Sequence, residues 1–249
     1  VPTLQPLPDG NLYQEDERGC WRMWNFIRGR TIHKIKKTTI ATAAGEIVGR
    51  FHSALSDLEH DFVAPKRDVH NTAQRMADLR TALENADGHR LEGPCRDLGE
   101  NLLKAWAKWD GTLDLPKRIC HGDLKISNIL FDSLSDTAVA LIDLDTIGPQ
   151  TLAAELGDAW RSWCNPAGED NPEMTVFNME VFEASAKAWA SKAPALALEE
   201  KQSLVGGIER ICLELSSRFC ADAINNSYFK EDRDRFPQIG THNLAKARA

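Results

Sequence analysis

The feature that most constrains this chain is a run of polar residues enclosed by short apolar segments. Residues 119–120 and 129–131 are apolar, and between them the chain reads His-Gly-Asp-Leu-Lys-Ile-Ser-Asn. A third apolar run, residues 139–142, leads directly into Asp143-Leu144-Asp145. Short apolar runs separated by polar turns are typical of brief strands in a hairpin. The polar segment is therefore either an ordinary turn between buried strands or a site that the strands hold in place.

Around this hairpin, apolar residues recur at the spacing of amphipathic helices. The first pattern begins at Thr38 or Thr39, which can cap a helix. The expected stripes are Ile47/Val48/Phe51/Leu55/Leu58, Met76/Leu79/Leu83 and Cys95/Leu98/Leu102/Trp106/Trp109, with further helices over residues 152–163, 173–192 and from 198 onward. Residues 1–31 instead indicate strands, because residues 19–27 are rich in aromatic and apolar side chains. The sequence predicts an α+β fold in which a small β piece leads into a mostly helical domain.

Composition and charge exclude several classes of protein. The 249 residues, 42% of them hydrophobic and 27% charged, are enough to bury a core. The net charge of −7 argues against a dedicated nucleic-acid binder, which needs a basic surface. No apolar run reaches the length of a membrane span, so we expect no membrane partner. The six cysteines are scattered without metal-binding spacing, which favours reduced thiols in a cytoplasmic protein.

The polar groups of the hairpin suit one kind of chemistry. Asp123 and Asn128 lie in the same turn, and Asp143 follows the next strand. Asn and Asp oxygens are suitable ligands for Mg²⁺ that binds a substrate phosphate. Asp123 would then be free to accept or orient a hydroxyl proton. These parts match phosphoryl transfer, in which catalysis is mostly positioning and charge neutralisation.

Several motifs also resemble those of a known family. HGDLKISN, followed by IDLD, resembles the catalytic and metal loops of the aminoglycoside phosphotransferase family, which shares the protein-kinase-like fold. GCWRMWNFIRG is similar to the family's adenine-binding strand and hinge, and IVGRFHSAL to the first helix of its large lobe. LGDAWRSW is similar to the following helix with its buried Asp. The combination of IDLDT, GDAWR and HNLAKAR is most similar to the N-acetylhexosamine 1-kinases.

The resemblance implies a protein-kinase-like fold that is mostly the helical C-terminal lobe, with an incomplete N-terminal β lobe. Residues 1–31 would be the remnant of that β lobe and the hinge, and residues 32–249 the helical lobe with the catalytic hairpin at 119–145. A kinase of this fold also needs a Gly-rich phosphate loop, and the chain contains no such motif. We therefore expect the natural protein to be longer at its N-terminus, and a chain without that loop to hold ATP poorly.

The resemblance also assigns roles to residues in the hairpin. Asp123 would be the catalytic base, or the carboxylate that orients the acceptor hydroxyl. Lys125 would offset charge on the transferring phosphoryl group. Asn128 and Asp143 would bind the magnesium that bridges the ATP phosphates. His121 is expected to hold the loop in shape rather than to act as a base, because the neighbouring Asp already fills that role.

Other residues would complete the site. Trp24 would lie behind the adenine ring, and Asn25 and Ile27 would give it backbone hydrogen bonds. Asp158 would support the catalytic loop from beneath. Arg161 would hold the acceptor, or would simply be a surface or ion-pair residue. A further histidine, His52, falls on a helix with an apolar face and is expected at the edge of the core.

The implied function is an ATP- and Mg²⁺-dependent kinase that phosphorylates a hydroxyl of a small molecule, a sugar or amino sugar of the N-acetylhexosamine kind. Its partners would be the nucleotide and the acceptor alone. Aminoglycosides, choline and homoserine are alternative acceptors. A pseudokinase that binds ligand without turnover is a second possibility. A third is a metal-dependent hydrolase with His121, Asp123 and Asp143 as its ligands, although the remaining histidines offer no further ligand at recognisable spacing.

Overall fold

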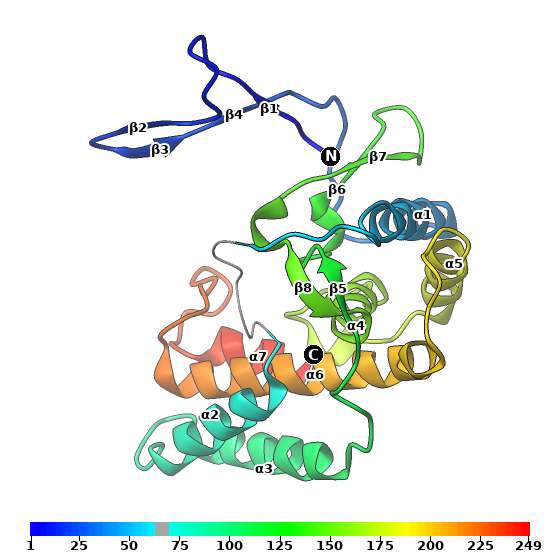
Figure 1. Ribbon diagram of the computed structural model, residues 1–249. Coiled ribbons are helices and arrows are strands. Elements are labelled where there is room, and N and C mark those ends of the chain that lie inside the picture. Colours follow the sequence, from blue (N-terminus) through cyan, green and yellow to red (C-terminus); the bar gives the residue numbers. More distant parts are fainter. Residues whose placement is uncertain (63–69) are drawn as a thin grey trace.

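The structure is a computed structural model that describes residues 1–62 and 70–249. Its N-terminal strands form an extended arm that projects from a helical body (Figure 1). The arm consists of two antiparallel pairs, β1 with β4 and β2 with β3. The strands of the arm are β1 (Leu4–Gln5), β2 (Gln14–Asp16), β3 (Gly19–Trp21) and β4 (Met23–Trp24). Many large apolar side chains of the arm, such as Tyr13, Trp21 and Phe26, are exposed.

The body is built from helices, and the amphipathic patterns of the sequence place most of them correctly. The helices are α1 (Thr38–Ala54), α2 (Thr72–Glu84), α3 (Glu92–Lys108), α4 (Leu152–Trp163), α5 (Met179–Ala190), α6 (Leu198–Asn225) and α7 (Thr241–Arg248). Two predicted boundaries are wrong. Leu58 lies beyond the end of α1. The helix expected over residues 173–192 begins only at Met179, because Asn178 caps it by accepting a hydrogen bond from the Val181 amide.

Two short sheets carry the polar segment between them. The strands are β5 (Lys117–Cys120), β6 (Ile129–Phe131), β7 (Ala138–Leu141) and β8 (Gly148–Thr151). The predicted hairpin of β6 and β7 is confirmed, with Ile129 opposite Leu141. The preceding strand, β5, pairs instead with β8. The sequence does not predict β8, because Gly148 and Pro149 are residues that strands disfavour.

The body has two clusters of buried apolar side chains. The larger one lies under the hairpin and joins it to α1, α4 and α5 through residues such as Leu124, Phe131 and Trp160. The smaller one joins α2, α3, α6 and α7, with Leu79 and Phe219 among its members. The hairpin therefore rests on a packed apolar base.

Within the described residues, none of the helices combines the length and the hydropathy that a membrane span requires.

Glycines allow the helices to pack closely beneath the hairpin. A Cβ on Gly157 of α4 would lie 2.5 Å from the carbonyl oxygen of Gly207 on α6. Gly45 and Gly49 of α1, predicted within a helix, similarly face the backbone of α5 at Ser185 and Trp189. These contacts leave no space for a side chain, so they fix the distances between the helix axes.

We expect Gly157→Ala to lower the free energy of unfolding by about 1–3 kcal/mol, because the added methyl group must push α4 and α6 apart. Gly93→Ala on α3 is the matched control, since its Cβ would meet nothing within 4 Å. Urea unfolding of both variants measures the difference. Equal stabilities of the two variants would contradict the close packing of α4 against α6.

Candidate functional site

The polar loop (residues 121–128) is held from below by a buried carboxylate. Glu155, in the first turn of α4, is 2% exposed. Its Oε1 accepts a hydrogen bond from the His121 amide at 2.8 Å, and its Oε2 accepts one from the Gly122 amide at 2.9 Å. Burial alone would raise the pKa of Glu155, but the hydrogen bonds from His52 and from the amides of the polar loop outweigh it, so the pKa is lowered. Glu155 is therefore an ionised carboxylate that fixes the start of the loop.

Two further helices hold Glu155 through His52. The indole Nε1 of Trp189 on α5 donates to Nδ1 of His52 on α1 at 3.0 Å. An indole N–H can only donate, so Nδ1 is an acceptor and the ring proton is on Nε2. Nε2 lies 3.3 Å from Oε1 of Glu155 and donates to it. His52 is thus a buried member of a hydrogen-bond chain, rather than the core-edge residue that the sequence suggested.

His121 is also engaged within the fold at both ring nitrogens. Nε2 lies 2.9 Å from the carbonyl oxygen of Ile142, and Nδ1 accepts a hydrogen bond from the Asp123 amide at 3.3 Å. The Thr146 hydroxyl donates to the His121 carbonyl at 2.7 Å. The imidazole therefore ties the polar loop to the segment after β7. No nitrogen of His121 is left for a metal, which counts against the hydrolase alternative.

Asp123, Lys125 and Asn128 form one hydrogen-bonded unit. Oδ2 of Asp123 accepts from Nζ of Lys125 at 2.6 Å and from Nδ2 of Asn128 at 3.0 Å. Nδ2 of Asn128 also donates to the Asp123 carbonyl at 2.8 Å. Among the described residues, neither Oδ1 of Asp123 nor Oδ1 of Asn128 has a hydrogen-bond partner. The unit thus presents two unsatisfied oxygens.

Asp143 is brought to this unit by the hairpin. The Ile142 amide donates to the Asn128 carbonyl at 3.0 Å, so the ends of β6 and β7 lie together. Asp143 then adopts the left-handed conformation, with φ at 64°, and starts the short helical turn Leu144–Thr146. Asp is one of the few residues that tolerate this conformation. Its carboxylate is exposed and forms no hydrogen bond in the described part of the chain.

The charge balance at Lys125 shows that the acidic groups gather at one place. Burial lowers the pKa of Lys125, but the hydrogen bond and charge of Asp123 and the charges of Asp143 and Asp158 outweigh it. The net shift is upward, so Lys125 stays protonated. Asp123 contacts the Lys125 ammonium group directly and two further carboxylates act on it through their charge, so this position has an excess of negative charge.

Asp158, predicted to support the polar loop, forms no hydrogen bond with it in the described part of the chain, whereas Glu155 accepts two loop amides. Its Oδ1 instead accepts from Nε and Nη2 of Arg161, at 3.3 and 3.1 Å. Nη1 of Arg161 lies 2.8 Å from Oε1 of Glu169. Burial lowers the pKa of Arg161 and both carboxylates raise it, with a net upward shift. The sequence predicts this role for Asp158 because LGDAWRSW resembles the family motif. Nothing in the local pattern indicates that Glu155 is buried.

The predicted adenine-binding residues lie on the arm. The Asn25 amide donates to the Thr3 carbonyl at 3.0 Å, whereas the Asn25 carbonyl and the Ile27 amide form no backbone hydrogen bond within the described residues. Trp24 is 38% exposed, and the guanidinium of Arg22 lies over its ring at 5.2 Å. Arg22 also pairs with Asp145 at 2.6 Å, which joins the arm to the segment that carries Asp143.

The comparisons with known proteins concern the family and the fold of the chain. A family model described as "Phosphotransferase enzyme family" matches residues 1–193. An aminoglycoside phosphotransferase from Alicyclobacillus acidocaldarius aligns with a TM-score of 0.62 and 15% identity, covering 99% of this chain and 74% of that chain. A microcompartment-associated aminopropanol kinase aligns with a TM-score of 0.58 and 15% identity, covering 99% and 73%. An ethanolamine kinase from Plasmodium vivax aligns with a TM-score of 0.54 and 13% identity, covering 94% and 66%. At these identities the likeness shows the fold, and the predicted protein-kinase-like fold is confirmed.

We expect Glu155→Gln to destabilise the protein at pH 7 by about 1–3 kcal/mol, because a carboxamide leaves one loop amide without an acceptor. The native pKa of Glu155 lies below its ordinary value of 4.5, so its contribution is complete above that pH and is lost as the pH falls through the native pKa. The stability difference between the parent and the variant should therefore shrink in acid.

Urea unfolding at several pH values between neutral and acid measures this difference. The exposed Glu84→Gln on α2 is the control and should stay within about 0.5 kcal/mol of the parent throughout. A difference between the parent and Glu155→Gln that is constant with pH would show that ionised Glu155 does not hold the loop.

Proposed function

Since the chain belongs to the phosphotransferase enzyme family, we propose that it is an ATP- and Mg²⁺-dependent small-molecule kinase. The acceptor is a hydroxyl of a sugar or amino sugar, of the N-acetylhexosamine kind. The observation that carries this proposal is the unit around Asp123, in which one carboxylate oxygen is fixed by Lys125 and Asn128 while the other is open. An oriented carboxylate beside an open position is what the transfer of a hydroxyl proton requires.

In the proposed reaction Asp123 acts on the acceptor. The acceptor hydroxyl donates a hydrogen bond to Oδ1 of Asp123, which orients the hydroxyl oxygen toward the γ-phosphorus of ATP. As the new P–O bond forms and the bond to the β-phosphate oxygen breaks, the hydroxyl proton passes to Asp123 and ADP leaves. This reaction requires that Oδ1 stays in place. The hydrogen bonds from the polar loop to Glu155 hold the loop that carries it.

The donor set beside Asp123 fits magnesium. Asn128 and Asp143 each offer an oxygen without a partner among the described residues, and Mg²⁺ prefers a few such ligands together with water and phosphate oxygens. Magnesium supplies charge neutralisation on the phosphates when it is bound. Asn128 can bind magnesium through Oδ1 and still hold Asp123, because the hydrogen bond to Asp123 comes from Nδ2.

The remaining roles follow from charge and position. Lys125, kept protonated by its acidic neighbours, offsets charge on the transferring phosphoryl group. The Asn25 carbonyl and the Ile27 amide bind adenine, with Trp24 against the ring. Arg161 is oriented by Asp158 and Glu169 and holds a polar group of the acceptor.

The aligned kinases support an acceptor that carries both hydroxyl and amino groups. Aminopropanol and ethanolamine, for which two of them are named, are both amino alcohols. The excess of carboxylates around Lys125 suits a neutral or cationic acceptor better than an anionic one. An amino sugar or its N-acetylated form meets both conditions.

We expect phosphoryl transfer from [γ-³²P]ATP to at least one member of a panel of N-acetylglucosamine, N-acetylgalactosamine, an aminoglycoside, choline, ethanolamine and homoserine. Asp123→Asn should lower kcat by about 10²–10⁴-fold, because the amide cannot accept the hydroxyl proton. The exposed Asp97→Asn on α3 is the control and should match the parent. Transfer to no panel member, together with nucleotide-dependent stabilisation, would favour the pseudokinase alternative.

We expect Asp143→Asn to raise the Mg²⁺ concentration needed for half-maximal activity by more than about tenfold, since even residues that only orient a metal ligand contribute that much. Activity measured over a Mg²⁺ titration at saturating ATP gives this value. An unchanged Mg²⁺ requirement in Asp143→Asn would remove Asp143 from the proposed metal site.

A further inference from the structure

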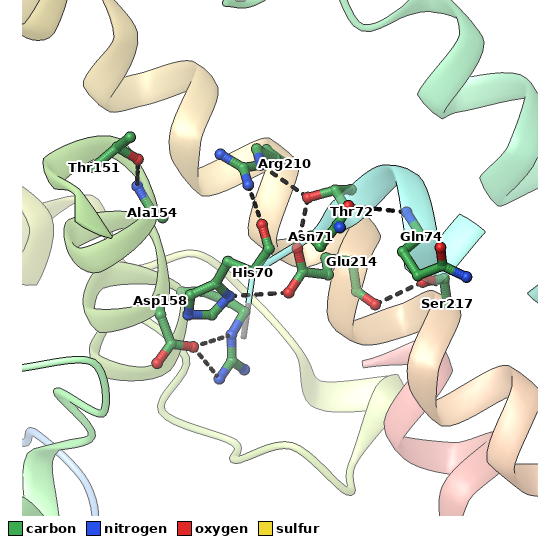
Figure 2. A network of polar contacts seen from close by, with 11 residues as sticks. His70, Asn71, Thr72, Gln74, Thr151, Ala154, Asp158, Arg210, Glu214 and Ser217 are labelled. Atoms are coloured by element: carbon green, nitrogen blue, oxygen red, sulfur yellow. Dashed lines mark hydrogen bonds and ion pairs between the residues drawn. The ribbon is translucent and has the colours of Figure 1, made fainter. Parts of the chain in front are cut away.

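A second buried carboxylate, Glu214 of α6, fixes a histidine that the proposed mechanism does not use. Glu214 is fully buried. Its Oε1 lies 2.9 Å from Nδ1 of His70, and its Oε2 accepts from the Thr72 hydroxyl at 2.5 Å. Arg210 of α6 donates from Nε to the Thr72 hydroxyl at 2.8 Å and from Nη2 to the His70 carbonyl. Figure 2 shows that both the ring and the backbone of His70 are tied to α6.

The protonation of Glu214 determines which nitrogen of His70 is available. Burial raises the pKa of Glu214, but the hydrogen bonds of His70 and Thr72 and the charge of Arg210 outweigh it. The pKa is lowered, so the carboxylate is ionised and can only accept. Nδ1 of His70 therefore carries the proton and donates. In the neutral imidazole, Nε2 then has a lone pair and is a hydrogen-bond acceptor.

The ring of His70 points from Glu214 toward α4. In Figure 2 the imidazole is directed away from α6 and toward Asp158. Nε2 forms no hydrogen bond with any described residue, and 10% of the side chain is exposed. Asp158 uses only Oδ1 for Arg161, so its Oδ2 is also open within the described residues. The same helix contacts the polar loop, because the indole Nε1 of Trp163 donates to the Leu124 carbonyl at 2.7 Å.

We propose that His70 is an acceptor-binding residue that determines specificity, with Nε2 accepting a hydrogen bond from a hydroxyl or amino group of the acceptor. Oδ2 of Asp158 accepts a second such bond from the same molecule. The acceptor must therefore carry at least two N–H or O–H groups besides the hydroxyl that is phosphorylated. Amino sugars and polyols meet this requirement, and molecules that present a carboxylate there do not. The inference rests on the proposed function, because it takes Asp123 as the place of phosphoryl transfer.

The variant His70→Asn tests this proposal with little disturbance of the buried network. The Asn side-chain nitrogen stands where Nδ1 does and can still donate to Glu214, whereas nothing replaces Nε2. The loss of one hydrogen bond should raise the acceptor KM roughly tenfold and leave the KM for ATP unchanged. Gln74→Ala on α2 is the control, because its side chain is exposed and donates a hydrogen bond to Asp78 of the same helix. The control should leave both constants unchanged.

Binding without turnover separates the two proposals. Saturation-transfer NMR measures the affinity of N-acetylglucosamine and of ethanolamine for the parent, His70→Asn and Gln74→Ala, with thermal unfolding to show that each variant is folded. Weaker binding to His70→Asn alone supports the inference, even if no compound is phosphorylated and the proposed function fails. Equal acceptor binding by folded His70→Asn and the parent overturns the inference and leaves the proposed function standing. If neither N-acetylglucosamine nor ethanolamine binds to the parent, the proposed acceptor class is rejected.

Discussion

The hydrogen bonds from the amides of His121 and Gly122 to Glu155 are the contact on which the rest of the site depends. The loop partly exposes Asp123 and Lys125 on one side, while its Leu124 and Ile126 are buried in the larger apolar cluster on the other. Beneath the loop, a desolvated carboxylate also accepts hydrogen bonds from two amides and a histidine at once. Such charge-assisted hydrogen bonds are strong in a dry interior, and removing one partner leaves a costly unpaired group. The loop geometry is thus set by buried groups that never meet a ligand.

This arrangement separates the part of the molecule that is rigid from the part that is open. Beneath the loop, α1, α4, α5 and α6 are held at fixed distances by glycines that contact backbone. Above it, Oδ1 of Asp123, Oδ1 of Asn128 and the carboxylate of Asp143 have no hydrogen-bond partner among the described residues. A second buried carboxylate, Glu214 of α6, fixes the ring of His70 in a similar way. In both places one buried acid orients one polar group that remains accessible.

The elements that could be predicted from the sequence are those with a local signal. The β6–β7 hairpin and α4 follow from apolar runs and spacing, and the cluster of Asp123, Asn128 and Asp143 follows from the turns between them. Glu155 could not be found in this way, because a glutamate at the start of a helix reads as an exposed residue that favours the helix dipole. Its burial depends on α1 and α5, which are distant in sequence. The pairing of β5 with β8 was missed for a related reason, since tertiary contacts there override the poor strand propensity of glycine and proline.

The hydrogen-bond chain from Trp189 through His52 to Glu155 has a direction, because indole donates, imidazole relays and carboxylate accepts. No member can be exchanged singly for a residue of opposite donor or acceptor character without leaving a neighbour unpaired. Positions 52, 155 and 189 should therefore change together during divergence, or not at all, whereas His70 has only one buried partner for its ring and is freer to vary. A loop anchored in this way keeps its geometry while the less constrained residues around it diverge.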